Sequence, residues 1–161
     1  MVFKPGDERS SYARAKQMRK HLRSEVCFDI IVSMYWRGAH TKHRVMYHIV
    51  WLPKYRKRIL KGELKKRVRE LLEECAEVNR WKIEELNIQP DHVHMLVQLR
   101  PDISVSKVIQ LFKGKSSRIL RKEFPSLVEF YWGDSFWSDG FFVETVGQVS
   151  IEKIKEYIRS Q

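Results

Sequence analysis

Cysteine is scarce in this chain of 161 residues, which has only Cys27 and Cys75. Two cysteines cannot build a disulfide framework or a cysteine-based zinc site, and they fit a reducing cytoplasm. Long apolar runs are also missing, because none reaches the roughly 20 residues that a transmembrane helix needs. No signal peptide with a small-residue cleavage site is recognisable. The sequence therefore predicts a cytoplasmic protein that does not enter a membrane.

Acidic residues are outnumbered, with 20 Asp and Glu against 31 Lys and Arg, a net charge of +11 and a pI near 9.8. A surplus this large on a small domain indicates a polyanionic partner, of which nucleic acid is the commonest. The chain is 43% hydrophobic, which supports a real core. The length fits one domain with an appendage. We assign residues 41–161 to the domain and residues 1–40 to an N-terminal extension whose structure the sequence does not decide.

Two histidines stand one residue apart in the apolar stretch 89–99. Alternate side chains of a β-strand point to the same face, so His92 and His94 should project together, with Cα atoms about 6.6 Å apart. The intervening apolar positions, Val93 and Met95 among them, should face the core. Two imidazoles this close can share one metal ion, although the pair alone is a weak signal.

The order of predicted elements indicates an α+β fold. Strands are expected at 44–52, 81–89, 92–99 and 141–146, and helices at 63–79, 104–124 and 150–161. Pro90 and Asp91 should form a tight turn between the second and third strands. This order predicts a ferredoxin-like (RRM-like) two-layer sandwich: a four-stranded antiparallel sheet, two long helices on one face, and a C-terminal helix that carries Tyr157.

Two segments concentrate positive charge without acidic residues. The loop 54–61 follows a strand and places Tyr55 among basic residues, which suits phosphates and a stacked base. The helix 107–122 is the second segment. Gly114, Lys115 and Ser116 imitate part of a phosphate-binding loop, but they lie inside a predicted helix and Ile109 replaces the required glycine. From charge, we predict DNA contacts by Lys54, Tyr55, Arg56, Lys57, Arg58, Lys113, Lys115 and Arg118.

Several polar residues near the histidines have simpler explanations. Cys75 lies on the apolar stripe of its helix and is predicted to be core. His48 is predicted to be structural, because the facing of its strand is undecided. Asp91 suits a turn, and an outer role beside a metal stays open. Glu144 neighbours the site strand, and its approach to a metal also stays open.

Five motifs, in order, resemble a known family. Residues 47–56 resemble its opening strand, and residues 90–96 match the His-hydrophobe-His motif of HUH endonucleases. Residues 113–117 fall where the family has the same run. Residues 137–147 resemble its last strand, and residues 155–161 its tyrosine helix. Together they resemble the single-tyrosine transposases of the insertion sequence 200/605 family, over residues 42–161.

The resemblance implies a mechanism. His92, His94 and Gln161 would bind a divalent metal, Mg²⁺ or Mn²⁺, beside a scissile phosphate of single-stranded DNA. Tyr157 would attack that phosphorus and hold the DNA through a 5′-phosphotyrosine. The family also implies hairpin-bearing DNA ends and a homodimer, in which one chain's tyrosine helix can complete its partner's site. Binding to DNA would associate the protein with the nucleoid.

Three hypotheses remain open at this point. The first is the transposase, and the second is a domesticated single-tyrosine HUH endonuclease or nickase. The third is a non-catalytic RRM-like binder of nucleic acid. The third predicts aromatic side chains on the exposed face of the central strands, where this sequence has His92 and His94.

Overall fold

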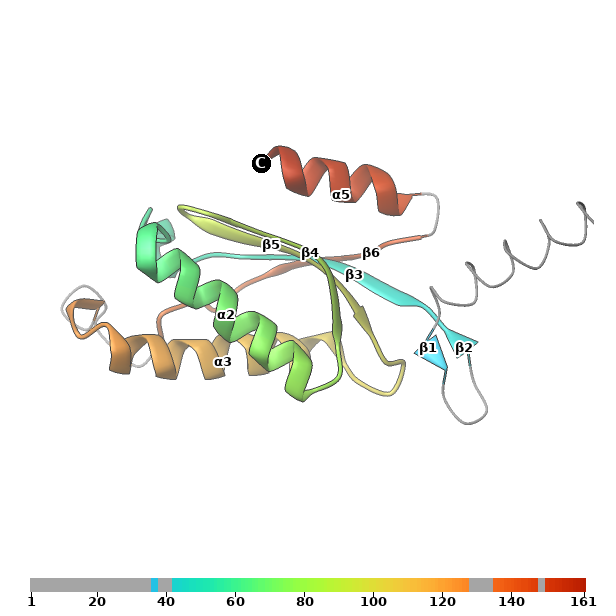
Figure 1. The fold of residues 1–161 in the computed structure, drawn as a ribbon, viewed down its shortest axis with the longest axis horizontal. Helices are drawn as coiled ribbons and strands as arrows, with labels where there is room; N and C mark the ends of the chain where they lie inside the picture. The colour runs from blue at the N-terminus through green and yellow to red at the C-terminus, as the bar shows by residue number, and fades with distance from the viewer. Residues whose placement is uncertain (1–35, 38–41, 128–134, 148–149) are drawn as a thin grey trace, which may run out of the picture. The chain divides into compact units, whose positions relative to one another are not determined.

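A computed structural model gives the fold of the chain and describes residues 36–37, 42–127, 135–147 and 150–161 (Figure 1). The chain divides into two units, Met1–His43 and Arg44–Gln161. In the first unit, β1 (Trp36–Arg37) pairs antiparallel with β2 (Lys42–His43). Most of the predicted extension lies outside the described residues, and the boundary between residues 40 and 41 stays a prediction.

The second unit is built on a four-stranded antiparallel sheet with the order β4-β5-β3-β6. Its strands are β3 (Val45–Trp51), β4 (Lys82–Gln89), β5 (His92–Leu99) and β6 (Phe142–Thr145). Gln89 pairs with His92, so Pro90 and Asp91 form the predicted two-residue turn of the β4–β5 hairpin. The two central strands are β5 and β3, which places the histidines in the middle of the sheet.

Two long helices, α2 (Gly62–Val78) and α3 (Val105–Glu123), cover one face of the sheet (Figure 1). The Ser104 side chain accepts a hydrogen bond from the backbone N–H of Lys107 and so caps α3. Between these helices and the sheet lies the main core. It includes the alternate β5 residues Val93, Met95, Val97 and Leu99, and also Cys75, as predicted. The predicted α+β sandwich is therefore confirmed.

The C-terminal helix α5 (Ile151–Ser160) packs on the opposite face of the sheet (Figure 1). Ile151 and Ile158 of the helix form a small second core with Met46 and Leu96 of the central strands. The face that carries the histidines is therefore only partly open, because α5 covers its Leu96 end. None of the helices in the described part of the chain is long and apolar enough to cross a membrane.

The segment around Ser116, which resembles part of a phosphate-binding loop in sequence, has a structural role. Ser116 lies inside α3, and its hydroxyl donates to the Phe112 carbonyl at 2.5 Å and accepts from Trp137 Nε1 at 2.8 Å. The neighbouring Ser117 hydroxyl accepts from the Phe136 backbone N–H at 2.9 Å. Buried polar groups are costly unless they are paired. These serines therefore pair buried polar groups of the loop before β6 and tie that loop to α3. The short 3-10 helix η1 (Lys54–Arg56) follows β3 and lies beside this loop, where the Lys54 backbone N–H donates to the Phe136 carbonyl.

Candidate functional site

The two histidines of β5 lie side by side on the sheet face that carries α5. The centroids of the His92 and His94 rings are 4.8 Å apart, with the rings nearly perpendicular. The His92 side chain is 20% exposed, whereas His94 is almost fully buried. The predicted shared facing of the pair is confirmed by this geometry.

The outer edge of the pair is fixed by a carboxylate. His92 Nδ1 lies 2.7 Å from Asp91 Oδ1, and Arg56 Nε donates to Asp91 Oδ2 at 3.1 Å. Partial burial opposes ionisation of Asp91, but its hydrogen bonds with His92 and Arg56 outweigh that effect and lower its pKa. Because an ionised carboxylate only accepts hydrogen bonds, His92 Nδ1 donates, and in the neutral imidazole the lone pair is then on Nε2.

The inner edge of the pair is fixed by two residues from other strands. His94 Nδ1 lies 3.1 Å from His48 Nε2, and His48 Nδ1 lies 2.8 Å from Glu144 Oε1. His48 belongs to β3 and Glu144 pairs opposite it on β6. A row of three side chains therefore crosses the central part of the sheet.

The environment of His94 disfavours its protonated form. Burial lowers the pKa of His94 to about 4, and positive charge on His92 or His48 would lower it in the same direction. An imidazole must be neutral to donate a lone pair to a metal. His94 is therefore in the protonation state that a ligand needs across the neutral pH range.

This pKa predicts how the metal-free protein responds to acid. Between pH 6.5 and about 4, an unfolded His94 binds a proton and the folded one does not. The unfolded state thus binds more protons, so the free energy of unfolding should fall as pH is lowered through this window, by up to about 3 kcal/mol. Urea denaturation in EDTA at several pH values measures this. His94→Asn should show a weaker pH dependence, and equal slopes for the two proteins would contradict the prediction.

Tyr157 of α5 lies over the histidines of its own chain. Its ring centroid is 5.7 Å from that of His94 and 6.3 Å from that of His48, with edge-to-face geometry in both cases. The residue is 48% exposed, so it is open to a large substrate. The structure thus brings together the three residues His92, His94 and Tyr157 that the sequence placed on separate elements.

Polar contacts along β4 hold the tyrosine helix. Asn87 Nδ2 donates to the Ile158 carbonyl at 2.6 Å, and Arg159 forms an ion pair with Glu85 at 2.8 Å. Lys155 Nζ forms an ion pair with Glu84 Oε2 at 3.3 Å. The register of β4 against β5 shifts between Ile83 and Glu85, and such a bulge lets neighbouring side chains reach the same partner. These contacts, with the small second core, set the position of Tyr157.

The ring nitrogens of His92 and His94 provide two of the ligands that a divalent metal would need. Both imidazoles have Nδ1 occupied and Nε2 available, which is the arrangement typical of metal-ligating histidines. Among the residues that the structure describes, no three His, Cys, Asp or Glu side chains gather to hold one ion. A third protein ligand to a metal at this pair would therefore be of another residue type. Gln161 is exposed directly after α5, one turn beyond Tyr157, and its role as that ligand stays a prediction.

The predicted DNA-binding loop lies beside the site through Arg56. Tyr55 and Arg56 both have positive φ, at 59° and 49°, in the turn η1. Tyr55 is 72% exposed, and the Lys57 ammonium lies 6.0 Å from the centroid of its ring. An exposed aromatic ring with adjacent cations is the arrangement that stacks and neutralises single-stranded nucleic acid. The DNA contacts of Lys54, Tyr55, Arg56, Lys57 and Arg58 stay predictions.

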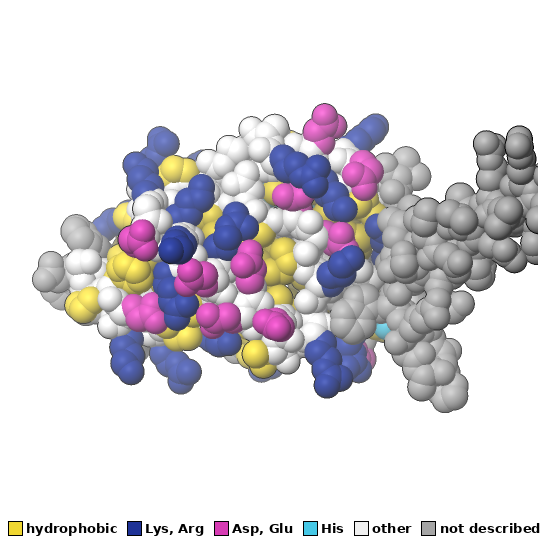
Figure 2. All heavy atoms as spheres, viewed as in Figure 1, with side chains coloured by type: hydrophobic (Ala, Val, Ile, Leu, Met, Phe, Trp, Pro, Cys, Tyr) yellow, Lys and Arg dark blue, Asp and Glu magenta, His cyan; other side chains and the backbone are white. Residues whose placement is uncertain are grey.

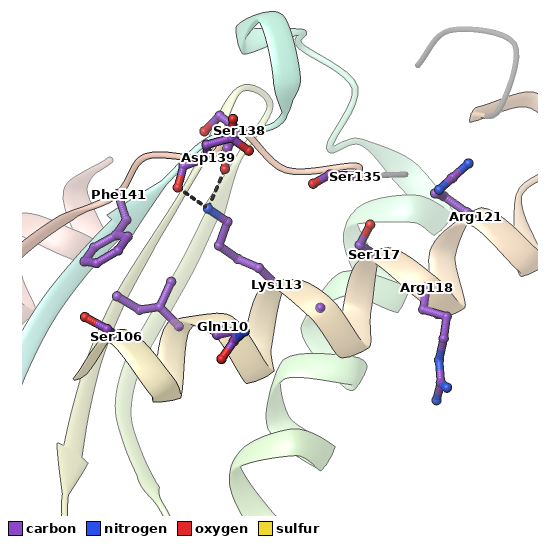
Figure 3. Close-up of a pocket in the computed structure, with 12 residues that line it drawn as sticks. Ser106, Gln110, Lys113, Ser117, Arg118, Arg121, Ser135, Ser138, Asp139 and Phe141 are labelled. Carbon is purple, nitrogen blue, oxygen red and sulfur yellow. Dashed lines mark hydrogen bonds between the residues drawn. The ribbon is translucent and has the colours of Figure 1, made fainter. Parts of the chain in front are cut away.

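The second predicted segment, on α3, lines a cavity of about 630 Å³ with the loop before β6 (Figure 3). Lys113 points across the cavity, and its ammonium donates to the carbonyls of Ser138, Asp139 and Gly140. Burial lowers the pKa of Lys113, and the Asp139 carboxylate opposes that shift. Lys113 thus ties the loop to α3 in this structure.

The other two predicted cations of α3 differ from Lys113 in their exposure. Arg118 is exposed and lines the same cavity (Figure 3), and Lys115 is half-buried. On the face seen in Figure 2, dark blue and magenta side chains are interspersed. Arg67 also forms ion pairs with Glu70, Glu74 and Glu123. This face is therefore not uniformly basic.

Two residues of the site have more specific contacts than the sequence indicated. His48 was predicted to be only structural, and the role of Glu144 was left open; the structure connects both to His94. The signal was present in β3, whose alternation puts His48 on one face with Met46 and Val50. What the sequence lacked was the pairing of β3 with both β5 and β6.

Comparisons with known proteins show the family of this chain. Residues 41–161 match the family described as "Transposase IS200 like". The chain is 39% identical over 123 residues to the transposase for insertion sequence element IS200 of Salmonella typhimurium, covering 76% of this chain and 80% of that protein. It is 30% identical over 125 residues to the ISDra2 transposase TnpA of Deinococcus radiodurans, covering 78% and 89% respectively.

Solved structures share the fold. A Deinococcus radiodurans R1 protein, solved as a candidate transposase, has a TM-score of 0.65 at 28% identity, over 78% of this chain and 97% of that one. A REP-associated tyrosine transposase bound to a REP hairpin has a TM-score of 0.55 at 15% identity, over 76% and 68%, which supports the fold alone. From the match over residues 41–161 and the IS200 relative, this chain belongs to the IS200-like transposases.

Proposed function

We propose that this chain cleaves and rejoins single-stranded DNA at hairpin-bearing transposon ends through a 5′-phosphotyrosine on Tyr157. The observation that carries the proposal is the placement of the Tyr157 ring against the His94 ring, which in turn lies against the His92 ring. A nucleophile and an electrostatic stabiliser of phosphate are thus adjacent on one partly exposed face.

We propose that His92 and His94 hold the divalent metal, with the amide oxygen of Gln161 as a third protein ligand. Imidazole with an amide oxygen suits Mn²⁺, whereas Mg²⁺ more often prefers oxygen ligands. When bound, such an ion would polarise the scissile phosphate and offset the charge that develops on it. Asp91 and Arg56 support this arrangement, because they hold the His92 ring from its other nitrogen.

Tyr157 performs both covalent steps in this proposal. Its phenolic oxygen loses its proton and attacks the phosphorus, forming an O–P bond as the bond from phosphorus to the 3′-oxygen breaks. The departing 3′-oxygen takes up a proton and leaves as a 3′-hydroxyl. In rejoining, a DNA 3′-hydroxyl attacks the same phosphorus and the tyrosine phenol is restored. Because the phosphotyrosine conserves the bond energy, no nucleotide cofactor is needed.

We infer that the DNA lies against the exposed loop 54–58 beside His92, and that α3 contributes further contacts through Lys115 and Arg118. The net charge of +11 supports a polyanionic ligand. Hairpin recognition is proposed from the family resemblance, and the structure of a REP-associated tyrosine transposase with this fold contains a REP hairpin. Homodimerisation, with sites completed by the partner's tyrosine helix, is a further proposal that the single chain leaves open.

Adduct formation tests the proposal. Single-stranded oligonucleotides from the regions flanking the gene, each with a hairpin, are labelled at the 5′ or 3′ end and incubated with protein and Mn²⁺. We expect a denaturant-resistant adduct that carries the 3′ label, a released fragment that carries the 5′ label, and no adduct in EDTA. The same sequences as duplexes are the control. An adduct that carries the 5′ label, or no adduct with any oligonucleotide, would contradict the proposal.

A further inference from the structure

A chain of hydrogen bonds leads from Glu144 to the proposed ligand His94 through His48. The two distances are 2.8 Å for Glu144 Oε1 to His48 Nδ1 and 3.1 Å for His48 Nε2 to His94 Nδ1. The planes of the two imidazoles differ by only 9°. Nearly parallel rings allow the in-plane N–H of one to point at the in-plane lone pair of the other.

The carboxylate determines the direction of this chain. Glu144 accepts only, so His48 Nδ1 must donate to it. A neutral His48 then has a lone pair at Nε2 and accepts from His94 Nδ1–H. His94 is left with its lone pair at Nε2, the nitrogen that is free to bind a metal.

Without the carboxylate, the opposite arrangement would also be available. A neutral imidazole can carry its proton on either nitrogen, and the nitrogen that bears it is set by the hydrogen bond of the other. If His48 carried its proton at Nε2, it would donate to His94 Nδ1. His94 would then hold its own proton at Nε2 and could not bind the metal there. His92 avoids this ambiguity, because its Nδ1 faces the Asp91 carboxylate directly.

We propose that His48 and Glu144 are positioning residues that hold His94 in its Nδ1–H tautomer, with Nε2 as the ligand atom. The inference rests on the proposed metal site at His92 and His94. Glu144 suits this role because it pairs opposite His48 across β3 and β6, and because its side chain is 47% exposed while that of His48 is 6% exposed. Removing such an outer partner typically weakens metal affinity about 10- to 100-fold.

The tautomer is measured directly in the metal-free protein. Long-range ¹H–¹⁵N spectra of ¹⁵N-histidine-labelled protein in EDTA distinguish Nδ1–H from Nε2–H imidazoles, and His94→Gln assigns the signal of His94. We expect the Nδ1–H form of His94 in the wild type and in Glu144→Gln, whose amide oxygen still accepts from His48. We expect a mixture of tautomers in Glu144→Ala.

Metal affinity provides the second readout, by Mn²⁺ titration without DNA. Glu144→Ala should weaken Mn²⁺ binding about 10-fold and His48→Leu up to about 100-fold. Glu144→Gln and His48→Gln should recover most of the affinity, because each restores an acceptor. If Glu144 acted only through its charge, Glu144→Gln would lose as much as Glu144→Ala. Thr145→Val, one residue along β6, is the control that should change neither readout. Glu144 variants keep the test valid even where a substitution of buried His48 prevents folding.

The outcomes separate this inference from the proposed function. An Nε2–H tautomer of His94 in the wild type, or equal affinities for the wild type and Glu144→Ala, would overturn the positioning role, whereas Mn²⁺ binding by the wild type would still support the metal site. Equal losses in Glu144→Gln and Glu144→Ala would also overturn it. Failure of the wild type to bind Mn²⁺, with His94 nevertheless in the Nδ1–H form, would instead contradict the proposed metal site.

Discussion

Tyr157→Phe should abolish the covalent protein–DNA adduct, with a loss in its rate of formation of at least about a thousand-fold. The substitution removes one oxygen atom, which is the proposed nucleophile. The phenylalanine ring keeps the edge-to-face contact that Tyr157 makes with His94, so the helix should stay in place. Adduct yield on a denaturing gel, measured over time with the labelled hairpin oligonucleotides, gives the rate.

The matched control is another tyrosine of the same domain. Tyr47 packs against the main core from β3, on the face opposite the histidines, so Tyr47→Phe should form the adduct at the wild-type rate. Single-stranded DNA binding in EDTA should be the same for the wild type and Tyr157→Phe. Persistence of the adduct in Tyr157→Phe would assign the nucleophile to a different residue.

His92→Ala and His94→Ala should each reduce DNA cleavage by at least about 100-fold, because each removes one of two imidazole ligands of the proposed metal. The two variants should differ in stability. His92 is the first residue of β5 and its side chain is 20% exposed, whereas His94 is buried under Tyr157 and bonded to His48. His92→Ala is therefore the cleaner test, and its circular dichroism spectrum and melting temperature should stay close to those of the wild type.

A Mn²⁺ titration of cleavage separates loss of metal from loss of DNA. For His92→Ala, high Mn²⁺ should recover part of the activity, while DNA affinity in EDTA should be unchanged. Wild-type cleavage by His92→Ala at low Mn²⁺ would contradict the metal site. Reduced DNA affinity in EDTA would instead place His92 among the direct DNA contacts.

Most of the fold was predictable because it follows from periodicity. The strand and helix bounds agree with the predicted ranges to within a few residues, and Pro90 with Asp91 gave the hairpin register that sets His92 and His94 together. The face of β5 toward the core was also predictable, since Val93 and Met95 alternate with the histidines. Short-range patterns of this kind are largely independent of tertiary packing.

The contacts between distant strands were not predictable from patterns. His48 contacts both His94 and Glu144 because β3 lies between β5 and β6. His94 and Glu144 are 46 and 96 positions from His48 in the sequence. Lys113 illustrates the same limit, because charge suggested a phosphate contact and the structure gives it three backbone carbonyls. Positive charge predicts that a side chain will contact oxygen atoms, but the tertiary structure determines which oxygen atoms these are.

The most direct test of the proposed mechanism is to identify the atom that holds the DNA. Purified adduct is digested with nuclease and then trypsin, which should release residues 156–159 as a short peptide. Mass spectrometry should find this peptide bearing a nucleotide through its 5′-phosphate on Tyr157. A nucleotide on any other residue, or one attached through a 3′-phosphate, would contradict the mechanism.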